Sequence, residues 1–130
     1  MAGRLLDTVT LIDLSKGIEP VRSRIHMWLE EDEVVAACPV TVAEFFAGVP
    51  PAERQRRDEF FDRLDFWEIT RDVARLAGIY RYDYARRGQQ LSTADTLLAA
   101  LVVVRGAVLV TSNERHFPMP EVRTFNPRIP

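Results

Sequence analysis

Three carboxylates stand at points where one predicted element gives way to the next. Asp7 ends the first apolar segment of the chain, while Glu44 and Asp95 each fall in the first turn of a predicted helix. If such side chains converge, they repel one another and at least one takes up a proton. A hard divalent cation removes that conflict, and an all-oxygen site favours Mg²⁺ or Mn²⁺. The chemistry that this pattern indicates is metal-assisted attack of water on a phosphodiester.

Each acid also has a simpler explanation. The segments 41–44 and 92–95 both match a capping box, in which the acid satisfies N–H groups at the start of a helix. Asp7 alone could cap the helix that follows it, and Asp13 is expected on a solvated helix face. Capping explains each acid better when it is taken singly. Three acids at the same edge of one sheet nevertheless favour a shared site over three coincidences.

A polar segment after a β-branched one adds to the candidate set, because Thr-Ser-Asn-Glu at 111–114 follows the apolar run 108–110. Other metal chemistry is not indicated. His26 and His116 are isolated and are expected at the surface or partly buried, and no cysteine pair has zinc spacing. Cys38 is the only cysteine, so we expect a buried thiol and no disulfide within the chain.

The chain alternates between apolar segments of strand length and longer segments with helical periodicity. Strands are predicted at residues 4–7, 34–38, 66–69, 108–110 and 122–125. Helices are predicted at residues 9–14, 21–31, 42–47, 51–64, 72–87 and 92–104. This alternation is typical of a three-layer α/β/α domain with a central, mostly parallel sheet of four to five strands. Ligands bind such sheets beyond the carboxyl ends of the strands, where the acids are expected.

Length and composition set further limits. The chain has 130 residues and a net charge of −2, so we expect a single domain over residues 1–130. The start, Met1-Ala2-Gly3-Arg4, lacks the apolar core of a signal peptide, and the longest apolar run, 97–104, is far shorter than a membrane span. We therefore expect a cytoplasmic protein with no membrane segment. The acidic total excludes a generally basic nucleic-acid binder but permits a local basic patch.

Four short motifs together resemble PIN-domain proteins, especially the VapC-type toxins. The resemblance covers nearly the whole chain, in the family's order and spacing, and the four motifs together are more specific than any one alone. They centre on Asp7-Thr8 within residues 5–14, on Glu44 within 40–48, on Asp95 within 91–100, and on Thr111-Ser112-Asn113 within 110–117.

The resemblance implies a metal-dependent endoribonuclease that hydrolyses RNA phosphodiester bonds with a metal-activated water. It assigns metal binding to Asp7, Glu44 and Asp95, with Mg²⁺ or Mn²⁺ as the cofactor. It adds Asn113 as a fourth catalytic position, where many relatives carry aspartate. Because an amide oxygen is neutral, a second metal would be held weakly there.

Residues beside the motifs are expected to support the site, namely Thr8, Thr111, Glu114 and Arg115. Arg115 is the preferred phosphate contact because it adjoins the fourth motif, whereas the arginines at 54, 56 and 57 are expected on a solvated helix face. The resemblance also implies three partners: an RNA substrate, a VapB-like antitoxin that occupies a groove between the early helices, and a second copy of the chain in a homodimer.

Other α/β families that handle phosphate fit less well. A phosphoacceptor receiver domain requires paired acids after the first strand and a lysine after the last, but Asp7 is followed by Thr8 and Lys16 is the only lysine. Neither a Gly-rich dinucleotide fingerprint nor a Walker A loop is present. The alternative that stays open is a PIN-like domain that binds RNA or protein without cutting, because Asn113 weakens the acid set.

Overall fold

A five-stranded parallel sheet forms the centre of the computed structural model, which describes residues 3–130. Its strands are β1 (Arg4–Leu6), β2 (Val35–Ala37), β3 (Asp65–Phe66), β4 (Val108–Val110) and β5 (Arg123–Phe125). They lie in the order β3-β2-β1-β4-β5, and every neighbouring pair is parallel. The mostly parallel sheet predicted from the sequence is confirmed. Met1 and Ala2, which entered the expectation about a signal peptide, lie outside the described residues.

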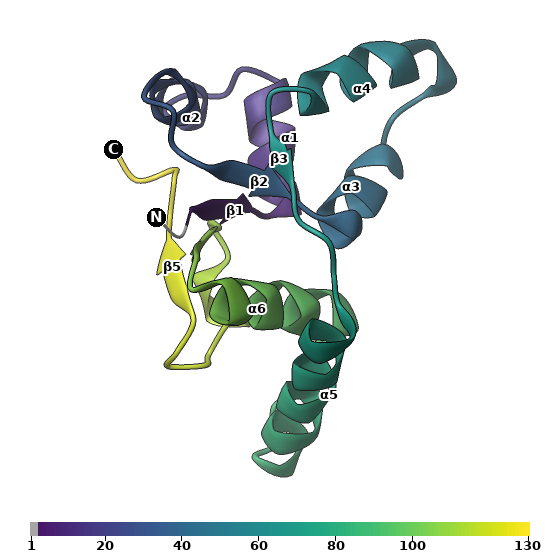
Figure 1. The fold of residues 1–130 in the computed structure, drawn as a ribbon, viewed down its shortest axis with the longest axis vertical. Coiled ribbons are helices and arrows are strands. Elements are labelled where there is room, and N and C mark those ends of the chain that lie inside the picture. Colours follow the sequence, from purple (N-terminus) through teal and green to yellow (C-terminus); the bar gives the residue numbers. More distant parts are fainter. Residues whose placement is uncertain (1–2) are drawn as a thin grey trace.

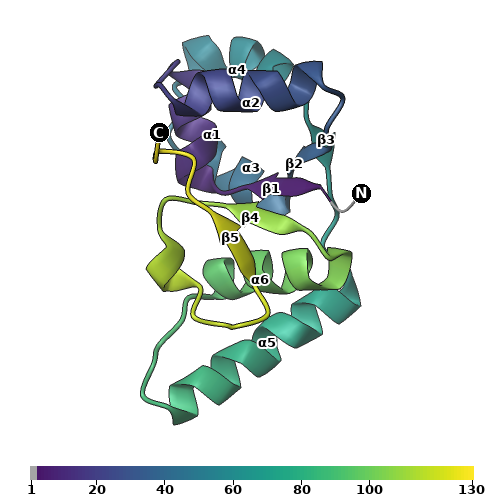
Figure 2. The ribbon, with the colours of Figure 1, turned by 90° about the vertical axis from the view of Figure 1, so that its left-hand side faces the viewer.

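Helices cover both faces of the sheet (Figure 1). One layer contains α1 (Thr8–Ser15), α2 (Val21–Glu30), α3 (Pro39–Phe46) and α4 (Arg54–Phe61), which the short 3-10 turn η1 (Pro51–Glu53) precedes. The other layer contains α5 (Arg71–Arg86) and α6 (Thr93–Arg105). Figure 2 shows the strands between these two layers, so the three-layer architecture is confirmed. Within residues 3–130, no helix is long and apolar enough to cross a membrane.

Successive residues on the central strands face opposite helical layers. Leu5 and Leu109 belong to the apolar cluster beneath α5 and α6, whereas Leu6 and Val110 belong to the cluster beneath α1–α4. All four side chains are completely buried. Because both faces of the sheet are covered, the strands are continuous apolar runs rather than alternating ones. The buried strands form a rigid base for the polar residues that follow them.

Helix α3 begins at Pro39, three residues earlier than the sequence predicts. Proline is well suited to the first position of a helix, because its fixed φ is helical and its missing N–H has no helical partner there. The backbone N–H of Cys38 donates to Oγ1 of Thr41 at 3.1 Å, which satisfies a group at the helix start. Thr41 therefore lies inside the helix and Glu44 lies in its second turn, so a capping box over 41–44 is wrong.

The direction in which the chain winds reverses between β1 and β4. From β1 the chain proceeds outward through β2 to β3, and it then crosses to β4 on the other side of β1. Connections that leave two adjacent strands in opposite directions open a crevice beyond their carboxyl ends. Asp7 directly follows β1 and Thr111 directly follows β4, so both residues stand at the edge of this crevice.

Candidate active site

A cavity of about 250 Å³ opens at the crevice. Its lining comes from the start of α1, from α3, from α6 and from the segment after β4. Five of the residues singled out in the sequence line it, namely Asp7, Thr8, Glu44, Asp95 and Asn113, together with Val9, Leu98, His116 and Phe117. Positions more than a hundred residues apart in the chain, such as Asp7 and Asn113, thus face one space.

Asp7 is the most buried acid of the cavity, with a residue exposure of 5%. Its backbone N–H donates to the carbonyl of Val110, which ties it to β4, and its Oδ1 accepts the N–H of Thr10 at 2.8 Å. Asp7 is thus the N-cap of α1 as well as a cavity residue. Burial raises the pKa of this carboxyl, hydrogen bonds from Thr111 and Thr10 oppose that rise, and the nearby Asp95 carboxylate adds to it.

Glu44 is joined to the start of α1 by a hydrogen bond. The Thr8 hydroxyl donates to Oε1 of Glu44 at 2.6 Å, although the two residues are 36 positions apart. Thr8 therefore links α1 to α3 and fixes the direction of the Glu44 carboxylate. A charge-assisted hydrogen bond of this length is among the stronger polar contacts in proteins.

Asp95 lies in the first turn of α6, where the Ser92 hydroxyl accepts its backbone N–H at 3.0 Å. The Asp95 side chain instead faces the cavity, where its Oδ2 lies 3.4 Å from Nδ1 of His116. His116 is exposed, as expected from the sequence, but it is not isolated, because it faces Asp95. Its position three residues after Asn113, in the fourth motif, was the signal that could have included it.

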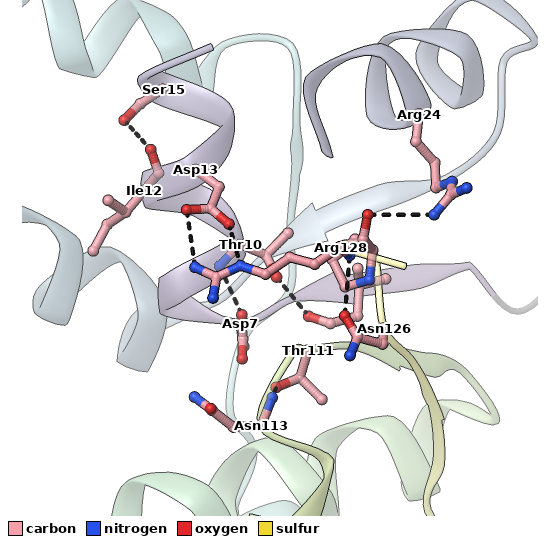
Figure 3. A network of polar contacts seen from close by, with 12 residues as sticks. Asp7, Thr10, Ile12, Asp13, Ser15, Arg24, Thr111, Asn113, Asn126 and Arg128 are labelled. Carbon is pink, nitrogen blue, oxygen red and sulfur yellow. Dashed lines mark hydrogen bonds and ion pairs between the residues drawn. The ribbon is translucent and has the colours of Figure 1, made fainter. Parts of the chain in front are cut away.

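The fourth motif contributes Asn113 directly and Thr111 indirectly. Thr111 is completely buried, and its Oγ1 accepts the backbone N–H of Asn113 at 3.0 Å. Figure 3 shows Thr111 and Asn113 on the segment opposite Asp7. The Glu114 carboxylate points elsewhere, because it accepts a hydrogen bond from Thr124 at 2.6 Å. Arg115 is exposed and lines a second cavity next to the first.

Asp13 is not on a solvated helix face, contrary to the sequence-based expectation. Its exposure is 7%, and its carboxylate receives two hydrogen bonds from Arg128, at 2.8 Å from Nε and 3.2 Å from Nη2. Figure 3 shows Arg128 reaching from the C-terminal segment to Asp13, on the helix that Asp7 caps. Arg24 on α2 also holds this segment, through the carbonyl of Ile129 at 2.7 Å.

A known protein family matches most of this sequence. The match is to the PIN domain and covers residues 4–121. The chain belongs to the PIN domain family. Among its relatives in Mycobacterium tuberculosis, Ribonuclease VapC19 is 30% identical, over 89% of this chain and 93% of the relative. Ribonuclease VapC10 from the same organism is 31% identical, over 88% of this chain and 86% of the relative.

Solved structures share the PIN fold of this chain. VapBC2 from Rickettsia felis, bound to a DNA fragment from its promoter, matches with a TM-score of 0.82 and 20% identity, over 95% of this chain and 97% of that one. DNA-bound VapBC from Salmonella typhimurium also gives a TM-score of 0.82, with 23% identity, over 96% of this chain and 98% of that one. Both matches support the three-layer fold derived above.

The oxygen-rich cavity of this PIN domain suits a hard divalent cation. Within residues 3–130, no three side chains of the His, Cys, Asp and Glu types lie close enough together to form a complete metal cage. Mg²⁺ does not require one, because it commonly binds one or two carboxylates and keeps several waters. Asp7 and Asp95 face the same cavity, and both burial and the Asp95 carboxylate raise the pKa of Asp7. A cation between them would compensate both effects, so the donor set fits the metal.

Proposed function

We propose that this chain is a metal-dependent endoribonuclease, the toxin of a VapBC-like toxin–antitoxin pair that acts in the cytoplasm. The observation that carries the proposal is the convergence of Asp7, Glu44, Asp95 and Asn113 on one cavity at the strand-order reversal. Similarity to two proteins named ribonucleases supports RNA as the substrate. Homodimer formation stays a prediction, which light scattering of the purified protein tests.

Asp7 and Asp95 would hold the cation, with Glu44 completing the site. Mg²⁺ or Mn²⁺, when bound, supplies Lewis acidity that activates water and neutralises charge on the phosphate. The protein's own contribution is orientation. Thr10 directs the buried Asp7 carboxylate, and Thr8 directs the exposed Glu44 carboxylate through a hydrogen bond, so both are oriented before the substrate arrives.

Asn113 gives the site a neutral fourth member. Its amide carries both a donor and an acceptor, so it can hydrogen-bond a phosphate oxygen where a carboxylate would repel it. The turn fixed by the Thr111 hydroxyl sets the position of the Asn113 backbone. We therefore propose that Asn113 positions the substrate, while the carboxylates bind the metal.

A groove on the α1–α4 layer supports the proposal of an antitoxin partner. It has a volume of about 350 Å³. Ile12, Phe45 and Val49 give it an apolar floor, and Lys16 and Arg57 lie on its rim with Glu53. Because Arg57 is paired with Glu53 at 3.1 Å, an amphipathic peptide can place apolar side chains on such a floor and an acidic one against Lys16. An antitoxin segment of that chemistry is the partner that we propose for this groove.

Cleavage of total cellular RNA by the purified chain tests the nuclease function. Reactions with Mg²⁺, with Mn²⁺ and with EDTA are compared for the unaltered protein and for Asp95→Asn. We expect discrete fragments that require metal and disappear with the variant. If the well-folded, antitoxin-free protein leaves all RNA intact, the binding-only alternative replaces the nuclease, with Asn113 as its cause.

A further inference from the structure

A second cavity adjoins the candidate active site and shares two of its residues. Its volume is about 290 Å³, and both Asp95 and His116 line the two cavities. From these shared residues it extends to Gln89 and Gln90, in the loop between α5 and α6, and to Arg115 on the 3-10 turn η2 (Glu114–His116). We call this space the glutamine cleft. Because the two cavities share residues, a chain bound in one could extend into the other.

The loop that carries the two glutamines is fixed at several points. Gly88 adopts a positive φ of 79°, which ends α5 sharply. The N–H of Gln89 then donates to the carbonyl of Tyr84 at 2.9 Å, and Nε of Arg81 donates to the carbonyl of Leu91 at 3.1 Å. These contacts fix the backbone of the loop. Gln89 and Gln90 are exposed, so both side-chain amides are accessible.

The opposite wall of the glutamine cleft is equally anchored. Phe117, directly after η2, is 6% exposed and belongs to the core beneath α5 and α6. Glu114 at the other end of η2 accepts the hydroxyl of Thr124 at 2.6 Å. Arg115 lies between these two anchors and is exposed. Its guanidinium is therefore carried on a fixed turn at the edge of the cleft.

The groups in the cleft match the chemistry of a nucleotide. Amide side chains offer a donor and an acceptor together, which suits the edge of a nucleobase, and a guanidinium suits a phosphate. Protein recognition of RNA sequence mainly uses unpaired bases, read by hydrogen bonds to their edges. A cleft lined by carboxylates alone would instead repel the phosphates of RNA. The two amides and Arg115 therefore make this cleft suitable for a nucleotide.

We propose that the glutamine cleft binds the nucleotide next to the scissile phosphate and determines base preference at that position. Gln89 and Gln90 contact the base, and Arg115 contacts the phosphate that links this nucleotide to the next. This inference rests on the proposed ribonuclease function, because the scissile phosphate is assigned to the cavity that contains Asp7. It adds a residue-level source of sequence specificity to that function.

Cleavage of a randomised single-stranded RNA pool, followed by sequencing of the new ends, tests the proposal. The double variant Gln89→Ala/Gln90→Ala is expected to lower base discrimination about tenfold at one position beside the cut, because it removes the amide groups that contact the base edge. Arg115→Ala is expected to raise KM several-fold with little change in base preference. Gln55→Ala and Arg63→Ala, at exposed positions on and after α4, are matched controls that should behave as the unaltered protein.

Binding of the same pool in EDTA separates this proposal from the nuclease function, because it requires no cleavage. The cleft variants should bind the RNA more weakly than the two controls. If they retain metal-dependent cutting with unaltered preference at every position, the glutamine cleft is not a base-reading site. If no protein cuts but the cleft variants alone lose binding, the cleft binds RNA, but the nuclease proposal and the cleft's place beside a scissile phosphate both fall. Equal binding by all variants overturns the cleft.

Discussion

Nδ1 of His116 lies 3.4 Å from Oδ2 of Asp95, and the two residues belong to different elements. His116 follows β4 on η2, while Asp95 stands at the start of α6. This separation is longer than a well-formed hydrogen bond, so the contact is weak. The imidazole nevertheless faces the carboxylate that we assign to metal binding. It can orient that carboxylate as hydrogen-bonded partners of metal ligands commonly do.

Replacing His116 should therefore weaken metal binding without unfolding the protein. We expect His116→Ala to reduce Mn²⁺ affinity roughly tenfold, the lower end of the loss seen for partners of metal ligands. Titration calorimetry measures the affinity, and thermal melting checks the fold. His26→Ala, on α2 and away from the cavity, is the matched control. Equal affinity of the two variants would show that His116 does not support the site.

Asp7→Asn should change the pH dependence of stability. Because burial raises the pKa of Asp7 in the folded protein, the folded state favours the protonated acid. That contribution is complete below the ordinary pKa of 3.8 and disappears as the pH rises through the folded value. Without metal, we thus expect Asp7→Asn to have the higher Tm at pH 7, and the difference to vanish near pH 3.5. Asparagine also caps helices well, so the cap persists.

Metal should reverse the order of these two proteins. A cation at a concentration 100 times its Kd stabilises a folded protein by about 2.7 kcal/mol. We expect Mn²⁺ to raise the Tm of the unaltered chain and to leave that of Asp7→Asn nearly unchanged. Melting curves at pH 7 with EDTA and with Mn²⁺ make the comparison. A similar rise in both proteins would remove Asp7 from the metal site.

The hydrogen bond between Thr8 and Glu44 should contribute to both stability and cleavage. Thr8→Val keeps the shape of the side chain but leaves the Glu44 carboxylate without its 2.6 Å donor. We expect a loss of about 1 kcal/mol in unfolding free energy and about a tenfold loss in cleavage rate. Thr93→Val is a suitable control, because Thr93 is the exposed first residue of α6. Combination with Glu44→Gln should show less than additive losses in rate.

The contact between Arg128 and Asp13 should hold the C-terminal segment against α1. Arg128→Ala removes both hydrogen bonds and leaves a nearly buried carboxylate unpaired. Since the arginine side chain is 50% exposed, we expect a loss of only about 1 kcal/mol in unfolding free energy. Chemical denaturation of Arg128→Ala, Asp13→Asn and the double variant measures the coupling. Strictly additive losses would contradict the ion pair.

The sequence was sufficient to predict the helices and strands and to predict that the acids lie at one edge of the sheet. Periodicity and turn residues predict every strand and helix of the sheet and its two layers, and parallel strands bring residues after β1 and β4 together. It could not predict side-chain contacts between residues that are far apart in the chain. Asp13 looked solvated because its partner, Arg128, lies 115 positions away. His116 looked isolated because only the turn at η2 directs it toward Asp95.

Glu44 was misread for a local reason. Two helix starts compete in that segment, one at Thr41 and one at Pro39, and both have favourable residues. The structure selects Pro39, with Thr41 satisfying the Cys38 N–H from within the helix. A shift of three residues moves Glu44 from the first turn to the second. Its role as a cap is thereby removed, while its place on the cavity remains.

The cavity is lined from both helical layers, by Asp7 and Glu44 from one and by Asp95 from the other. A cation bound there would join the two helical layers directly, in addition to the contacts that they make through the sheet and between α3 and α6. Hydrogen–deuterium exchange would then slow in α1, α3 and α6 together when metal is added. Metal binding would thus be detected in helices outside the cavity, because the exchange rate reports how often the two helical layers separate.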